Sequence, residues 1–143
     1  GWDAHGSLPK EHESQCKDVD QASAALITDL RQRGMLDETL VVWGGEFGRT
    51  SYCQGKLTET NYGRDHHPRC FTTWLAGGGI KGGQAIGKSD KDGGQPAERP
   101  VTPGDIAATV YRHFGVPLDA TYEDHRGRPR YIVEEGKPLR ELI

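Results

Sequence analysis

The sequence predicts an α/β fold, and three observations lead to this prediction. Residues 9–33 carry apolar side chains at helical spacing, and a second helix start follows at Thr102. Two short apolar runs, residues 39–43 and 70–76, are each followed by glycine, as strands of a sheet often are. The order helix, strand, long loop, strand, helix is typical of α/β proteins, whose ligands collect beyond the carboxyl ends of the strands.

The first predicted helix spans residues 9–33. Pro9 suits the first turn after Ser7, because a proline there loses no helical hydrogen bond. Gly34 suits the position just past the end, where a left-handed backbone is common. A narrow apolar stripe is expected to face the core, formed by Val19, Ala22, Leu26 and Leu30.

The middle of the chain is predicted to hold strands separated by polar, glycine-rich segments. Residues 39–43 are apolar and β-branched, which predicts a buried strand. Residues 44–69 are interpreted as an irregular loop of the kind that builds active sites, and residues 70–76 as a second strand. A short further strand is expected at residues 81–86, followed by a charged excursion over residues 87–99.

The second helix has a strong start signal. Thr102 is a good N-cap, Pro103 suits the first turn, and Asp105 stands at the third position of a capping box. Gly115 is expected to end the helix, and an edge strand is expected at residues 130–133. The apolar side of this helix should contain Ile106, Ala107, Val110 and Phe114.

Composition limits both the core and the partners. A length of 143 residues suits one domain, but hydrophobic residues make up only 34% and glycine numbers 20, about twice the usual ~7%. The core should therefore be modest and need a partner or a further segment to complete it. The net charge of -3 argues against nucleic-acid binding, and no run approaches the ~18 apolar residues of a membrane span.

Asp3 and His5 are the first candidate metal ligands. They lie two residues apart, so in an extended segment both side chains point to one face and can bind one ion. The alternative is a turn in which Asp3 caps the following helix and His5 plays no part.

Glu46 and Arg49 are the second candidate pair. Glu46 follows the first predicted strand on a glycine-rich loop, where a carboxylate can be a metal ligand or a general base. Arg49 can face a substrate oxyanion, because a guanidinium group matches phosphate or sulfate in a two-point contact. The alternative is a plain salt bridge between the two.

The segment of residues 64–68 contains the densest group of potential ligands. Pro68 favours an extended backbone at His67, so neighbouring imidazoles point apart and only one can serve a given ion. His66 and His67 are therefore alternatives, and both can equally be solvated in a loop. Arg64 adds a second guanidinium close by.

Taken together, five segments resemble the DUF1501 family, a family of sulfatase-like proteins placed in the alkaline phosphatase superfamily. They are residues 1–6, 40–50, 63–68, 75–83 and 99–103, in order over nearly the whole chain. The resemblance implies a three-layer α/β/α fold with a metal site at the strand ends. It also implies that residues 1–143 are the C-terminal part of one such domain. The N-terminal half, with the nucleophile, would then lie outside the chain.

By motif, the resemblance assigns Asp3, His5 and His66 to one metal ion, and Glu46 to the first position of a strand-end ligand pair. Phe47 stands where the superfamily pair has histidine, and the spacing of Asp3 and His5 is shorter than usual. Because at least two imidazoles are present, zinc or manganese is the favoured divalent metal, with calcium and magnesium as alternatives.

The activity implied is metal-dependent hydrolysis of a small-molecule sulfate or phosphate ester, with Arg49 or Arg64 steadying the oxyanion. The alternative is a non-catalytic metal-binding or cell-surface protein of the same fold, which the departure at Phe47 favours. Family members often carry export signals, so the resemblance implies a periplasmic or secreted protein. The substrate and the oligomeric state are not indicated by the sequence.

Overall fold

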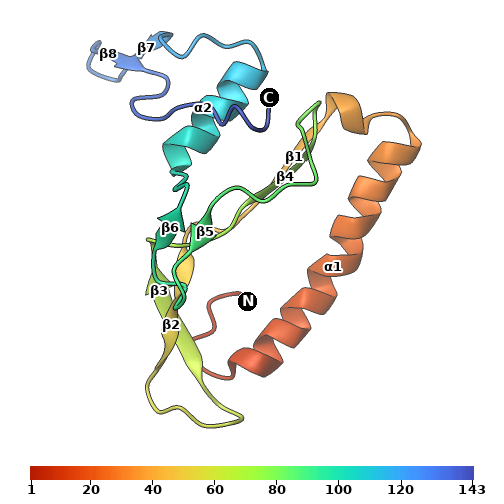
Figure 1. The fold of residues 1–143 in the computed structure, drawn as a ribbon, viewed down its shortest axis with the longest axis vertical. Helices are drawn as coiled ribbons and strands as arrows, with labels where there is room; N and C mark the ends of the chain where they lie inside the picture. Colours follow the sequence, from red (N-terminus) through yellow and green to blue (C-terminus); the bar gives the residue numbers. More distant parts are fainter.

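The computed structural model describes residues 1–143 and shows a small mixed α/β domain (Figure 1). Its strands form four two-stranded antiparallel sheets, with the pairs β1–β4, β2–β3, β5–β6 and β7–β8. Neither helix is both long and apolar enough to cross a membrane. The domain contains both helices and strands, while the three-layer α/β/α arrangement stays a prediction.

Helix α1, Leu8–Gln32, has the predicted ends. Gly34 adopts a left-handed φ of 69°, and its N–H donates to the carbonyl of Arg31, so the helix stops there. The predicted apolar stripe is only partly buried: Leu30 is buried, whereas Leu26 is 50% exposed. The helix therefore presents apolar surface that the rest of the chain does not cover.

Strand β1, Leu40–Trp43, follows the short 3-10 helix η1, Leu36–Glu38, and pairs with β4, Trp74–Gly77. Trp43 lies opposite Trp74, and their parallel rings stack with centroids 6.0 Å apart. The prediction of a buried strand is wrong, because Trp43 is 44% exposed. A sheet of only two strands has no neighbouring strand or helix on this part of its face to exclude water.

The prediction of an irregular loop over residues 44–69 is also wrong. Strand β2, Gly48–Gln54, pairs with β3, Gly63–His67, and the two form a hairpin. The register places Arg49 opposite His66, and a bulge interrupts the pairing between Arg49 and Cys53. Polar residues on both faces removed the alternation by which strands are predicted.

Thr50 holds the bulge of this hairpin together. Its side chain is almost fully buried; the hydroxyl donates to the carbonyl of Tyr52 at 2.8 Å and accepts the N–H of Asp65 at 3.0 Å. The side chain therefore replaces the ladder hydrogen bonds that the bulge removes. Thr50 therefore holds β3 against β2 next to the pair formed by Arg49 and His66.

The strand expected at residues 81–86 is absent, and the prediction is wrong. A small hairpin lies further along instead, formed by β5, Lys88–Ser89, and β6, Pro96–Glu98. His67 contacts its turn, because the ring Nε2 lies 2.6 Å from the carbonyl oxygen of Gly94.

Helix α2, Pro103–His113, begins with the predicted capping box. The N–H of Asp105 donates to the Thr102 hydroxyl at 3.1 Å, and the N–H of Thr102 donates back to the Asp105 carboxylate at 2.9 Å. Phe114 was expected on the apolar side but is exposed, whereas Ala108 and Thr109 are buried.

The tail forms one further hairpin, in which β7, Thr121–Glu123, pairs with β8, Pro129–Tyr131. The second strand overlaps the edge strand predicted at residues 130–133. The tail then returns to α2, because the N–H of Lys137 donates to the carboxylate of Asp105 at 2.7 Å.

We expect Asp105→Asn to lower the free energy of unfolding by about 1–3 kcal/mol at neutral pH, since two backbone N–H groups lose a charged acceptor. Burial opposes ionisation of this carboxyl, but hydrogen bonds from Thr102 and Lys137 outweigh it and lower its pKa. The contribution is therefore complete above the unfolded pKa of about 3.9 and is lost as the pH falls towards the lower folded pKa. Urea unfolding of both proteins from neutral to acid pH checks this, and a gap that stays constant would contradict it.

The core is as modest as the composition predicts. The buried apolar residues come from both ends of the chain and from the two helices, namely Ala4, Leu8, Leu30, Ala108, Leu139 and Leu142. The chain exposes 10411 Å², whereas a compact monomer of its mass exposes about 7300 Å². The chain therefore exposes more surface than a compact monomer, and the expected need for a covering partner or segment stays a prediction.

Candidate metal centre

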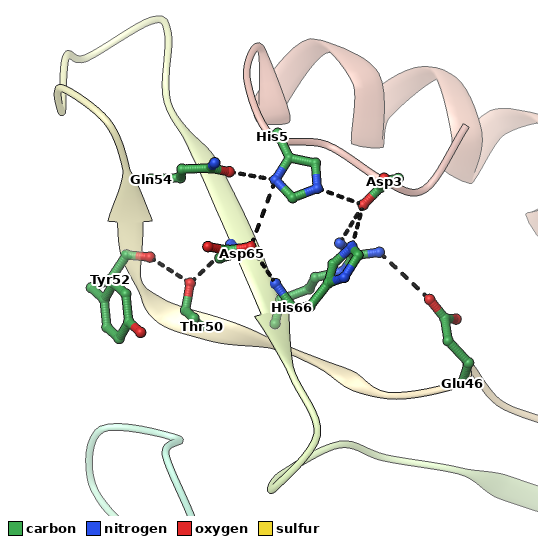
Figure 2. Close-up of polar contacts among 9 residues, drawn as sticks. Asp3, His5, Glu46, Thr50, Tyr52, Gln54, Asp65 and His66 are labelled. Carbon is green, nitrogen blue, oxygen red and sulfur yellow. Dashed lines mark hydrogen bonds and ion pairs between the residues drawn. The ribbon is translucent and has the colours of Figure 1, made fainter.

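The N-terminal segment lies beside strand β3 (Figure 2). The N–H of Arg64 donates to the carbonyl of Ala4 at 3.0 Å, and the N–H of Leu8 donates to the carbonyl of Tyr62 at 2.9 Å. Gly63 makes this approach feasible, because a Cβ at this position would overlap the backbone of His5. The start of the chain is thus fixed beside the hairpin. Its backbone turns at Asp3–His5, where the N–H of His5 donates to the carbonyl of Asp3 at 3.1 Å, so the extended conformation expected for this segment is wrong.

Three candidate ligands meet at this place. Oδ1 of Asp3 lies 2.9 Å from Nε2 of His5 and 2.8 Å from Nε2 of His66. The three ligand atoms all lie within 4.8 Å of one another, and all three residues are exposed. Figure 2 shows both imidazoles pointing at the same carboxylate oxygen.

The spacing of these atoms suits one ion. A divalent cation with bonds of about 2.0–2.1 Å to nitrogen and oxygen holds neighbouring ligand atoms roughly 3 Å apart. The separations from Asp3 to His5 and to His66 have this size. One carboxylate and two imidazoles form a ligand set that zinc and manganese accept.

Arg49 completes the surroundings of the carboxylate. It lies opposite His66 in the hairpin, and its Nη1 donates to Oδ1 of Asp3 at 2.6 Å. This hydrogen bond, together with that of His66, holds the pKa of Asp3 well below its usual range. Asp3 is consequently a carboxylate, and hence a potential ligand, throughout the ordinary range of pH.

The structure distinguishes the two neighbouring histidines. Successive side chains of a strand point to opposite faces, so only one of the two can face Asp3. His66 does so, while His67 contacts the carbonyl of Gly94 on the other side. The ring of Phe47 packs against that of His66, with centroids 4.5 Å apart, and so borders the cluster on one side.

Two other predicted site residues lie outside the cluster. Glu46 is exposed, and its carboxylate lies 3.8 Å from Nη2 of Arg49 (Figure 2), as in the salt-bridge alternative. Arg64 donates from Nη1 to the carbonyl of Thr50 at the bulge. The structure therefore brings together Asp3, His5 and His66, with Arg49 beside them.

Gln54 is a residue that sequence reasoning missed. Its Oε1 contacts Nδ1 of His5, the ring nitrogen that faces away from Asp3. The missing signal was the hairpin itself, because only the pairing of Gln54 with Gly63 brings this amide to the N-terminal segment. An irregular loop over the same residues would give no reason to single it out.

Comparison with known proteins identifies a family but no activity. The family model described as "Protein of unknown function (DUF1501)" matches residues 1–143. No curated protein matches the chain, and no solved structure does. Because the family model covers the chain from end to end, this protein belongs to the DUF1501 family.

Proposed function

We propose that the protein is a metal-dependent hydrolase of small-molecule sulfate or phosphate esters, built on a fold of the alkaline phosphatase superfamily. The observation that carries this proposal is the meeting of Asp3, His5 and His66 within 4.8 Å, with a guanidinium group at the same carboxylate. These residues come from two segments far apart in the sequence, so it is the fold that brings them together.

Asp3, His5 and His66 would hold the metal ion. Three protein ligands at an exposed position leave further coordination positions open, which is typical of catalytic rather than structural zinc sites. A divalent cation bound there supplies Lewis acidity towards an ester oxygen and lowers the pKa of a bound water or nucleophile. Zinc and manganese are the favoured ions because two of the three ligands are imidazoles.

Arg49 would bind the oxyanion of the ester. One of its nitrogens donates to Asp3, while Nη2 lies 3.8 Å from Glu46, beyond hydrogen-bond distance. The remaining N–H groups of a planar guanidinium can contact two oxygens of a sulfate or phosphate group. The contact with Asp3 holds this fork beside the proposed metal ion before the substrate arrives.

A non-catalytic metal-binding protein is the second candidate. Phe47 favours it, because the resemblance places a histidine of a second metal site at this position, and the phenylalanine ring that packs on His66 instead cannot bind a metal ion. Such a protein would bind the ion with the same three residues and use it for stability or for binding a partner.

Turnover of aryl sulfate and aryl phosphate esters by the zinc- or manganese-loaded full-length protein separates the two candidates. The hydrolase proposal predicts turnover that is lost in Asp3→Ala and falls in Arg49→Lys, since lysine cannot make the two-point contact. Metal binding without turnover would support the second candidate, and absence of metal binding would contradict both.

Glu46→Ala is expected to leave the affinity for zinc within about fivefold of the wild-type value. The reason is that an exposed ion pair with Arg49 contributes under about 1 kcal/mol, and Glu46 lies outside the cluster. Zinc titration against a competing chelator measures this affinity. A loss as large as that in Asp3→Ala would make Glu46 a ligand.

A further inference from the structure

We propose that Gln54 is a positioning residue of this site: it accepts the Nδ1–H of His5 and so presents Nε2 of His5, with its lone pair, to the metal ion. The inference deepens the proposed function and rests on the metal centre described above. It assigns a definite tautomer to His5.

The hairpin register brings Gln54 to His5. Gln54 is the last residue of β2 and pairs with Gly63, the residue whose missing Cβ admits the backbone of His5. Gln54 therefore belongs to the strand pair that supports the backbone of His5, and its side chain reaches the ring (Figure 2). One pair of opposed residues thus fixes both the backbone and the ring of this ligand.

The tautomer follows from what Gln54 offers to the ring. An imidazole that binds a metal ion through Nε2 carries its proton on Nδ1, and the atom of Gln54 beside Nδ1 of His5 is Oε1, which can only accept that hydrogen bond. A neutral imidazole has one N–H, which leaves the lone pair on Nε2. This lone pair faces Oδ1 of Asp3, a second acceptor, at 2.9 Å. In the metal-bound protein the ion would lie between these two atoms, whereas without it a proton on Nε2 can make a hydrogen bond to Asp3.

The carboxylate of Asp65 does not take this role. Its Oδ1 lies 3.9 Å from Nδ1 of His5, beyond hydrogen-bond distance, and it accepts the backbone N–H of His66 at 2.9 Å instead. Histidines that bind metals almost always donate their other ring N–H to a partner of this kind, which fixes the ring and raises its basicity. For His5, that partner is the amide of Gln54.

The test combines two variants. Gln54→Leu removes the hydrogen-bond acceptor with a side chain of similar size, and Gln54→Glu keeps an acceptor oxygen at this position. Gln21→Leu is the matched control, because Gln21 is exposed on α1 and far from the hairpin in sequence. Nitrogen-15 NMR of the zinc-loaded proteins reports which ring nitrogen of His5 carries the proton. Zinc titration against a competing chelator reports the affinity.

We expect Gln54→Leu to shift His5 away from the Nδ1–H tautomer and to weaken zinc binding by about 10–100-fold. Gln54→Glu should restore both, and Gln21→Leu should change neither. Unchanged tautomer and affinity in Gln54→Leu would overturn the role of Gln54 and leave the metal centre standing. A wild-type protein that binds no zinc would instead overturn the metal centre, and with it the purpose assigned here to Gln54.

Discussion

Replacement of His66 by alanine is expected to lower the affinity for zinc by more than about 100-fold, beyond the 10–100-fold that is usual when only a supporting residue is changed. The variant removes one of two imidazoles, so only Asp3 and His5 of the three ligands remain. Zinc titration against a competing chelator measures the loss.

His67→Ala is the matched control, because it removes the same ring from the neighbouring residue. His67 faces the carbonyl of Gly94 and not Asp3, so its loss should loosen the turn between β5 and β6 and leave zinc affinity nearly unchanged. Equal losses in the two variants would mean that the hairpin as a whole, and not the ring of His66, determines binding.

Gly63→Ala is the second change with a large expected effect. A Cβ at Gly63 would overlap the backbone of His5, so the N-terminal segment must move away from β3. We expect a loss of about 1–3 kcal/mol in the free energy of unfolding, as for other overpacked sites. Zinc affinity should fall as well, because Asp3 and His5 both leave with the segment.

Gly82→Ala controls for the general effect of replacing glycine. A Cβ at Gly82 meets no atom within 4 Å, and this glycine is not among those with positive φ. Urea unfolding and zinc titration of both variants, side by side, check the prediction. If Gly63→Ala kept wild-type zinc affinity, the close approach of the two backbones would not be needed for the site.

The parts of the fold that depend on residues close together in the sequence could be predicted from it. The capping box at Thr102 and the glycine stop at Gly34 are local, because each is formed by residues within one or two turns. The hairpin β2–β3 was missed, because its register depends on a buried threonine at a bulge and not on an alternating pattern.

In the candidate site, too, local features could be predicted from the sequence and those that depend on the hairpin register could not. The spacing of Asp3 and His5 predicts a shared ion, and the alternation of a strand limits the next segment to one of His66 and His67. Which of the two faces Asp3 depends on the register of the hairpin, which the sequence does not reveal. The placing of Gln54 has the same cause. Glu46 was expected at the site because it follows a strand. Its carboxylate instead lies outside the cluster, 3.8 Å from Nη2 of Arg49.

X-ray absorption at the zinc edge of the zinc-loaded protein tests the central claim most directly. The account predicts nitrogen and oxygen neighbours only, at about 2.0–2.1 Å, with the scattering pattern of two imidazoles. His66→Ala should reduce that pattern or abolish binding. Sulfur neighbours at about 2.3 Å would instead place the ion at the free cysteines, and a zinc ion without imidazole ligands would equally contradict a centre formed by Asp3, His5 and His66.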